Sequence, residues 1–96
     1  MSLQAKTQET PEIKPRQKFE GHTHWVTGII HLPGGQRMMT CSYDGSLRVW
    51  NSHSGKQIGN NWRNREGVNA IALSLDGTKV VCGTSDSEVL LWNMLE

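Results

Sequence analysis

Histidines are the residues of this chain whose type could hold a metal ion, and their spacing does not complete a metal site. His22 and His24 stand two positions apart, as two ligands of one ion can. The other two histidines, His31 and His53, lie far along the chain. No cysteine pair or carboxylate cluster supplies the remaining ligands of a zinc set. The sequence therefore predicts neither a metal site nor any other cofactor.

Ser42, Asp44 and His22 have the side chains of a catalytic triad, but the sequence around them lacks the pattern of one. No glycine-flanked nucleophile turn surrounds Ser42, and the chain has no glycine-rich phosphate-binding loop. The two cysteines, Cys41 and Cys82, lie within apolar runs, where a free thiol packs as a small hydrophobic group. We expect buried thiols and no enzymatic activity.

Charge and hydropathy argue against several classes of partner. The net charge of +1 at pH 7 gives no field that would attract nucleic acid or an anionic membrane surface. No apolar run approaches the roughly 18 residues of a membrane-spanning helix, and residues 1–10 are too polar for a signal peptide. We therefore expect an intracellular, cytoplasmic protein without nucleic-acid or membrane partners.

An internal repeat organises most of the sequence. Shifting the chain against itself by 42 positions brings like residues together without a gap. The superimposed pairs are Val26 and Val68, Ile29 and Ile71, Gly35 and Gly77, Asp44 and Asp86, and Trp50 and Trp92. A period of about 40–45 residues is that of a four-stranded propeller blade.

Short apolar or alternating runs between turn residues predict strands rather than helices. In the first repeat the expected strands are 26–32, 37–41, 46–51 and a weaker, more polar run at 56–62; in the second they are 68–74, 79–83 and 88–93. Turns rich in Gly, Pro, Asp and Ser separate them about every 8–12 residues, which is typical of an all-β chain.

These features resemble the WD40 repeat family. The first repeat has Gly21-His22 at its start, Asp44 in its second turn and Trp50-Asn51 at its end, with Asn in place of the family's final Asp. The resemblance implies a hydrogen-bonded structural tetrad of His22, Thr40, Asp44 and Trp50. It also implies an all-β fold of two four-stranded antiparallel blades.

The second repeat keeps only part of that motif. Asp86 and Trp92 occupy the tetrad positions of the turn and the third strand, whereas Asn64 replaces the histidine and Cys82 replaces the threonine. We therefore expect an incomplete second tetrad and a looser second blade.

The order of the expected strands implies a mode of assembly. We divide the chain into a flexible N-terminal tail (1–15) and two blades (16–96), in which 16–21 is an outer strand for a neighbouring blade, 22–62 the first blade, and 63–96 a second blade without its own outer strand. In closed family members, such an overlap joins the first and last blades. Identical chains would then complete a propeller head to tail, with four chains favoured over three, because about 45° per blade lies nearer than about 60° to the common seven-blade form.

Trp25 and Tyr43 are the candidate partner-binding residues. Each stands beside a tetrad position, in loops that the resemblance places on one face, and exposed aromatic side chains are favoured interface anchors. Trp62, Arg63 and Arg65 follow in a loop that would extend the same surface.

The sequence thus predicts a non-catalytic protein-interaction module or scaffold that also associates with itself. Two other interpretations stay open. One is a carbohydrate-binding, lectin-like propeller in which Trp25 or Trp62 stacks on a sugar. The other is a truncated or engineered propeller fragment with no function beyond assembly.

Overall fold

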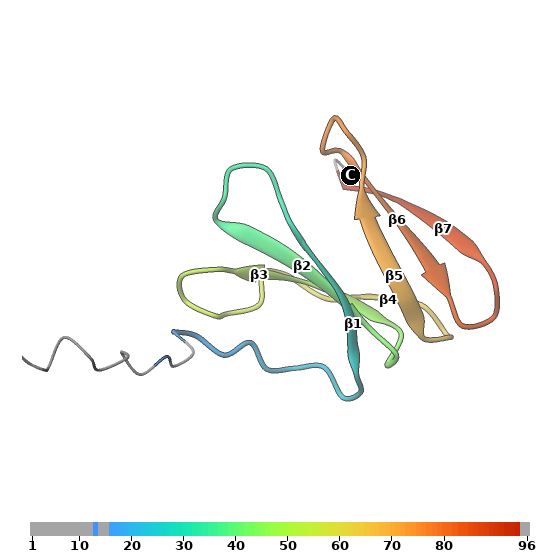
Figure 1. Cartoon of the computed structure of the whole chain (residues 1–96), viewed down its shortest axis with the longest axis horizontal. Coiled ribbons are helices and arrows are strands. Elements are labelled where there is room, and N and C mark those ends of the chain that lie inside the picture. The colour runs from blue at the N-terminus through green and yellow to red at the C-terminus, as the bar shows by residue number, and fades with distance from the viewer. Residues whose placement is uncertain (1–12, 14–15, 95–96) are drawn as a thin grey trace, which may run out of the picture.

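The computed structural model describes residue 13 and residues 16–94 (Figure 1). These described residues contain seven strands. The strands are β1 (Val26–His31), β2 (Arg37–Ser42), β3 (Ser46–Asn51), β4 (Trp62–Arg63), β5 (Val68–Leu73), β6 (Lys79–Thr84) and β7 (Val89–Asn93). The flexible tail expected at residues 1–15 lies outside the described residues, apart from residue 13.

Two antiparallel sheets contain these strands, in the orders β1-β2-β3-β4 and β5-β6-β7. The described residues contain no helix. The all-β fold with two repeated antiparallel units is therefore confirmed. The second sheet has three strands, because no outer strand pairs with β7 among the described residues.

The 42-residue repeat extends to the strand register. Val26 pairs with Ser42 at the start of the β1–β2 ladder, and Val68 pairs with Thr84 at the equivalent place in β5–β6. Each ladder then has an irregularity two residues later, before Gly28 and before Ala70. The second sheet therefore reproduces the first in local detail, so residues 42 apart occupy equivalent places in their blades.

The outer strand of the first blade differs from the continuous run expected at 56–62. Gln57 forms an isolated bridge with Trp50, and pairing resumes only at β4, opposite Ser46 and Leu47. Between the two pairings, Gly59 has a φ of 72°, a left-handed conformation that turns the chain away from the sheet. The first sheet therefore extends through residue 63, one position beyond the expected boundary.

The core lies between the two sheets. Its buried residues are Leu32, Met39, Cys41, Leu47, Val68, Val80 and Cys82. A Cβ at Gly28 would lie 2.7 Å from Ile71 Cγ2, so the backbone of β1 approaches the second sheet more closely than any side chain would permit. Both cysteines are free and buried, and burial raises the pKa of the Cys41 thiol.

The segment expected to serve as an outer strand for a neighbouring blade, residues 16–21, forms no strand within this chain. It runs beside the first sheet instead, where Phe19 packs edge-on against Trp50 with ring centroids 5.8 Å apart. The first blade's tryptophan thus receives an aromatic neighbour from the chain that precedes the blade.

Candidate functional site

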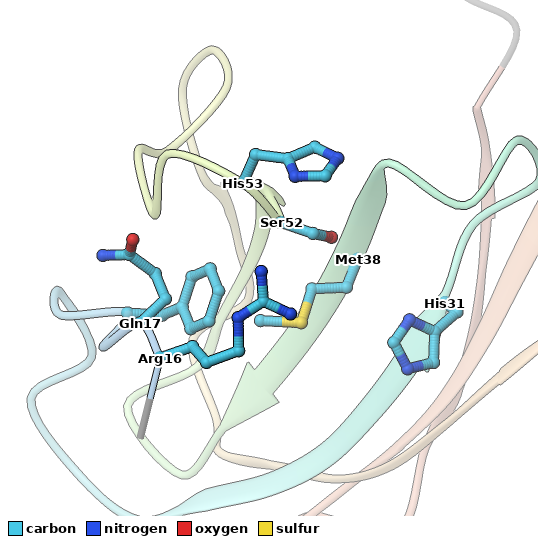
Figure 2. A pocket seen from close by; sticks show the side chains of 7 residues that line it. Arg16, Gln17, His31, Met38, Ser52 and His53 are labelled. Carbon is cyan, nitrogen blue, oxygen red and sulfur yellow. The ribbon is translucent and has the colours of Figure 1, made fainter. Parts of the chain in front are cut away.

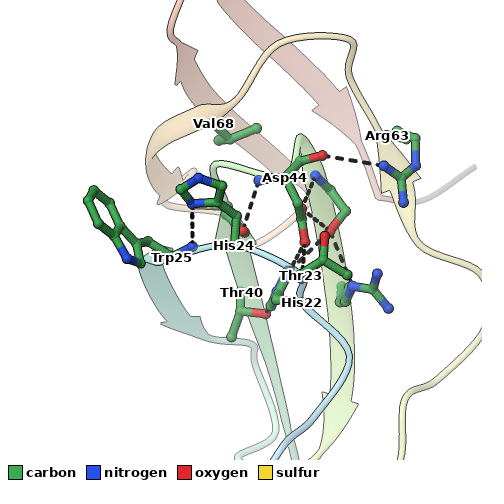
Figure 3. Close-up of polar contacts among 12 residues, drawn as sticks. His22, Thr23, His24, Trp25, Thr40, Asp44, Arg63 and Val68 are labelled. Atoms are coloured by element: carbon green, nitrogen blue, oxygen red, sulfur yellow. Dashed lines mark hydrogen bonds and ion pairs between the residues drawn. The ribbon is translucent and has the colours of Figure 1, made fainter.

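A hydrogen-bonded chain crosses the first blade from the loop before β1 to Trp50 in β3, and Figure 3 shows its members His22, Thr40 and Asp44. His22 Nδ1 lies 3.1 Å from Asp44 Oδ2, and His22 Nε2 lies 2.6 Å from Thr40 Oγ1. Trp50 Nε1 donates to the same hydroxyl at 2.8 Å. The set is satisfied when Nδ1 carries the ring proton, because the hydroxyl then accepts from the indole and donates to Nε2.

Two residues outside the family motif also hold Asp44. Ser46 N and Oγ donate to Asp44 Oδ1 at 2.7 and 2.6 Å, and Thr23 N donates to Oδ2 at 2.9 Å. Burial by itself raises the pKa of this carboxyl, but hydrogen bonds from Ser46, Thr23 and His22 outweigh burial and hold the pKa well below its ordinary value. The Asp-Gly-Ser turn is the sequence signal for Ser46, since aspartate commonly accepts from the backbone two residues later.

Burial decides what this network can do. The side chains of His22 and Asp44 are 5% and 4% exposed, and Trp50 is 1% exposed. Ser42 is fully buried, and its Oγ accepts a hydrogen bond from the Asp44 backbone at 3.0 Å. No nucleophile of this group faces solvent. The arrangement can fix the turn against the strands, but it presents no reactive atom to a substrate.

The equivalent positions of the second blade are bonded differently. Trp92 Nε1 donates to Cys82 Sγ at 3.3 Å. The exposed Asp86 accepts a hydrogen bond from the Thr84 hydroxyl, and Asn64 Nδ2 donates to the Glu66 carbonyl at 3.0 Å. Among the described side chains, no hydrogen-bonded chain links Asp86 to Trp92.

Three rings gather at the end of the first blade. The centroid of His24 lies 5.3 Å from that of Trp25 and 5.7 Å from that of Tyr43, and the latter two rings are 5.8 Å apart. Trp25 is 71% exposed and Tyr43 is 39% exposed. We call these three residues the aromatic cluster. The structure thus brings Trp25 and Tyr43 together, and adds His24, whose position next to Trp25 was the available sequence signal.

The other three candidate binding residues have different surroundings. The Trp62 ring stacks on Trp92 of the second blade, with centroids 5.4 Å apart and planes at 29°. It is therefore partly buried between the blades and packs against the core. Arg63 is exposed and donates to the Asp44 carbonyl at 3.3 Å, which keeps it near the same turn as Tyr43. Arg65 is exposed in the loop between β4 and β5.

A cavity of about 490 Å³ lies on the face of the first sheet that is turned away from the second (Figure 2). Its lining residues are Arg16, Gln17, Phe19, His31, Met38, Ser52 and His53. The described residues contain no group of three His, Cys, Asp or Glu side chains placed to hold a metal ion. They also contain no helix that is long and apolar enough to cross a membrane.

Comparison with known proteins gives the family. The family model described as "WD domain, G-beta repeat" matches residues 13–51, which contain β1 to β3, and residues 56–93, which contain β4 to β7. The chain belongs to the WD40 repeat family.

One curated relative is the small ribosomal subunit protein RACK1 of Drosophila melanogaster, which is 29% identical over 85 residues. The match covers 86% of this chain and 27% of RACK1, so the chain spans about a quarter of that relative's length.

Solved structures share the fold at lower identity. The structure of U3-55K superposes with a TM-score of 0.72 at 20% identity, over 80% of this chain and 25% of that one. The computationally designed Ika4 protein superposes with a TM-score of 0.66 at 22% identity, over 81% of this chain and 46% of that one.

Proposed function

We propose that this chain is a non-catalytic protein-interaction module with a scaffold role. The observation that carries the proposal is the aromatic cluster. Trp25 is 71% exposed, and contact of so large an apolar ring with water is unfavourable unless a partner covers it. The loop that carries Trp25 is also held in place by hydrogen bonds. Thr23, two positions earlier, is tied to Asp44, and the Trp25 carbonyl accepts from Tyr43 N at 3.0 Å.

The surroundings of the cluster favour a peptide or protein ligand over a small substrate. None of the three rings of the cluster lines either cavity described in this chain. The exposed Arg63 donates to the carbonyl of Asp44, the residue that follows Tyr43. The name of RACK1 as a ribosomal subunit protein supports an intracellular location for the present chain.

Selection from a displayed random-peptide library tests the cluster. Peptides enriched on the wild-type chain should lose binding to Trp25→Ala and Tyr43→Ala. They should retain binding to Ile58→Ala, a matched control whose side chain is 41% exposed on another part of the first blade. Equal binding to the cluster variants and the control would reject this docking surface. Capture of glycans by the Trp25 ring on an array would favour the lectin-like alternative instead.

Head-to-tail assembly of identical chains forms the second part of the proposal. The outer face of the second sheet is apolar and contains an open hollow of about 250 Å³. The hollow is lined by Ala70, Ile71, Ala72, Val81, Cys82, Gly83 and Val89. Leu91 and Val89 are 65% and 76% exposed, although their equivalents 42 positions earlier, Val49 and Leu47, pack in or against the core.

A second copy is suited to cover the outer face of the second sheet. Within the chain, the equivalent face of the first sheet packs against the second sheet. If the second sheet of one copy packed in the same way against the first sheet of the next copy, this apolar surface would be buried. Light scattering should report the mass of a closed ring, with four chains favoured over three. A single-chain mass at micromolar concentration would reject the assembly without affecting the peptide test.

A further inference from the structure

The seam between the two blades includes a contact between two turns. Pro33 lies in the β1–β2 turn, and Gly77 lies in the β5–β6 turn; Figure 1 shows both turns at the same end of their sheets. A Cβ built on Gly77 would lie 2.7 Å from Pro33 Cγ. The proline ring therefore rests directly on the glycine backbone, and the absence of a side chain at residue 77 permits the contact.

The positions equivalent to Pro33 and Gly77 in the other blade make no such turn-to-turn contact within the chain. The 42-residue repeat places Leu75 at the position of Pro33, and Gly35 at the position of Gly77. Leu75 is completely exposed. A Cβ built on Gly35 would meet nothing within 4 Å. The second blade thus presents an apolar projection where the first blade makes its seam contact, and the first blade presents an uncovered glycine.

We propose that Leu75 of one copy packs on Gly35 of the next copy and forms the turn-to-turn contact of the head-to-tail interface. The inference rests on the proposed assembly and gives it one specific anchor. The occupant of each site is a second copy of this chain, because the contact is the one that the blades of a single chain already make.

A difference along the same seam explains why a leucine occupies the projecting position. Gly28 lies against Ile71 within the chain, and the equivalent pair between copies is Ala70 with Ile29, which is 58% exposed. The Ala70 methyl would stand where a Cβ on Gly28 comes within 2.7 Å of the isoleucine. Something must therefore shift at this place, and a slightly wider interface between copies provides the room. Leu75 is longer and more flexible than proline, so it can reach across the wider gap.

Two variants test the contact from opposite sides. Leu75→Ser removes the projection, and it should leave the single chain folded because Leu75 has no packing to lose. Gly35→Asn adds a side chain where Leu75 of the preceding copy would rest. Asparagine tolerates the φ of 76° at this position better than other residues with a side chain do, and the space around Gly35 is open.

Each variant alone should raise the concentration at which assembly is half-dissociated by at least about tenfold, as expected for the loss of one buried leucine per interface. Mixing the two variants should restore one interface, because the serine variant keeps Gly35 and the asparagine variant keeps Leu75. Light scattering of an equimolar mixture should then show a two-chain species, with no larger ring. Ile58→Ser, another exposed apolar position, should assemble as wild type.

The outcomes separate this contact from the assembly itself. A wild-type chain that remains monomeric overturns both. A wild-type ring whose mass and dissociation midpoint survive Leu75→Ser overturns the contact alone. Variants that are folded by circular dichroism, yet stay monomeric when mixed, also overturn it. Rescue of the two-chain species supports both the pairing of these residues and the head-to-tail direction.

Discussion

The two blades share a strand register but differ in what holds their third-strand tryptophan. Trp50 donates a hydrogen bond to the Thr40 hydroxyl, and its ring makes edge contacts with the rings of His22 and Phe19. Trp92 has the Cys82 sulfur and the stacked ring of Trp62. The register therefore survives the loss of the polar network, because apolar alternation and packing against the neighbouring blade are enough to place the strands.

Trp62 and Phe19 have equivalent roles in this comparison. Each comes from the chain segment that leads into a blade, and each places a ring against that blade's tryptophan. Trp92 in the second blade keeps this aromatic contact without a polar network like that of the first blade. The polar network is thus an additional set of stabilising contacts in the first blade, whereas the aromatic contact occurs in both blades.

Truncation of the two tryptophans should give the largest difference between the blades. Trp50→Ala removes a side chain that is 1% exposed and leaves the Thr40 hydroxyl without its indole donor, so it should cost roughly 3–5 kcal/mol of unfolding free energy. Trp92→Ala removes a half-buried ring whose N–H donates to the Cys82 sulfur, a weak acceptor, and it should cost clearly less unfolding free energy. Urea unfolding followed by circular dichroism measures both. Equal losses would show that the network adds nothing to burial.

Protonation of Asp44 should give an intermediate effect. Its pKa is lowered in the folded chain, so its contribution is fully present above the ordinary aspartate pKa of about 4 and is lost as pH falls toward the lower folded value. Asp44→Asn should remove this part of the acid dependence and cost on the order of 1–3 kcal/mol near neutral pH. Urea unfolding at a series of pH values between 2 and 7 measures the change.

Asp76 offers a matched control for that experiment. Hydrogen bonds from Ser74 and Thr78 also lower the pKa of Asp76, but this carboxylate lies on an exposed turn. Solvent screens such a group, so Asp76→Asn should reduce stability near neutral pH by less than Asp44→Asn does. A larger loss at Asp76 would contradict the view that burial gives the first network its strength.

The sequence was informative where the repeat constrained two places at once. Apolar runs between turn residues predicted most of the strands, and the family resemblance implied the tetrad positions of the first blade. The 42-residue repeat then carried those positions to the altered residues Asn64 and Cys82. The sequence was less informative about the outer strand of the first blade. It predicted one strand over residues 56–62, but the left-handed conformation of Gly59 interrupts the pairing. It also could not show that Trp62 faces the next blade, because the direction of that ring depends on packing between sheets.

Restoring the lost network in the second blade should give the smallest and most discriminating effect. Cys82→Thr supplies the hydroxyl that Thr40 provides in the first blade, but no imidazole is present to accept its proton. The single change should therefore cost about 1 kcal/mol, because it buries an incompletely paired hydroxyl. Asn64→His alone should stay within about 0.5 kcal/mol of wild type, since the Asn64 side chain donates to the nearby Glu66 carbonyl and the backbone hydrogen bond from Asn64 N to Gly45 O does not depend on the side chain.

The double variant should then recover what Cys82→Thr loses, because the new histidine can bridge Asp86 and the new hydroxyl as His22 bridges Asp44 and Thr40. A double-mutant cycle by urea unfolding should give a favourable coupling of at least about 0.5 kcal/mol. Cys82→Ser combined with Asn64→His is the control for hydroxyl chemistry without the methyl group. Purely additive effects would mean that the backbone of the second blade no longer brings these positions within hydrogen-bonding distance, so that its register is conserved but its loop geometry is not.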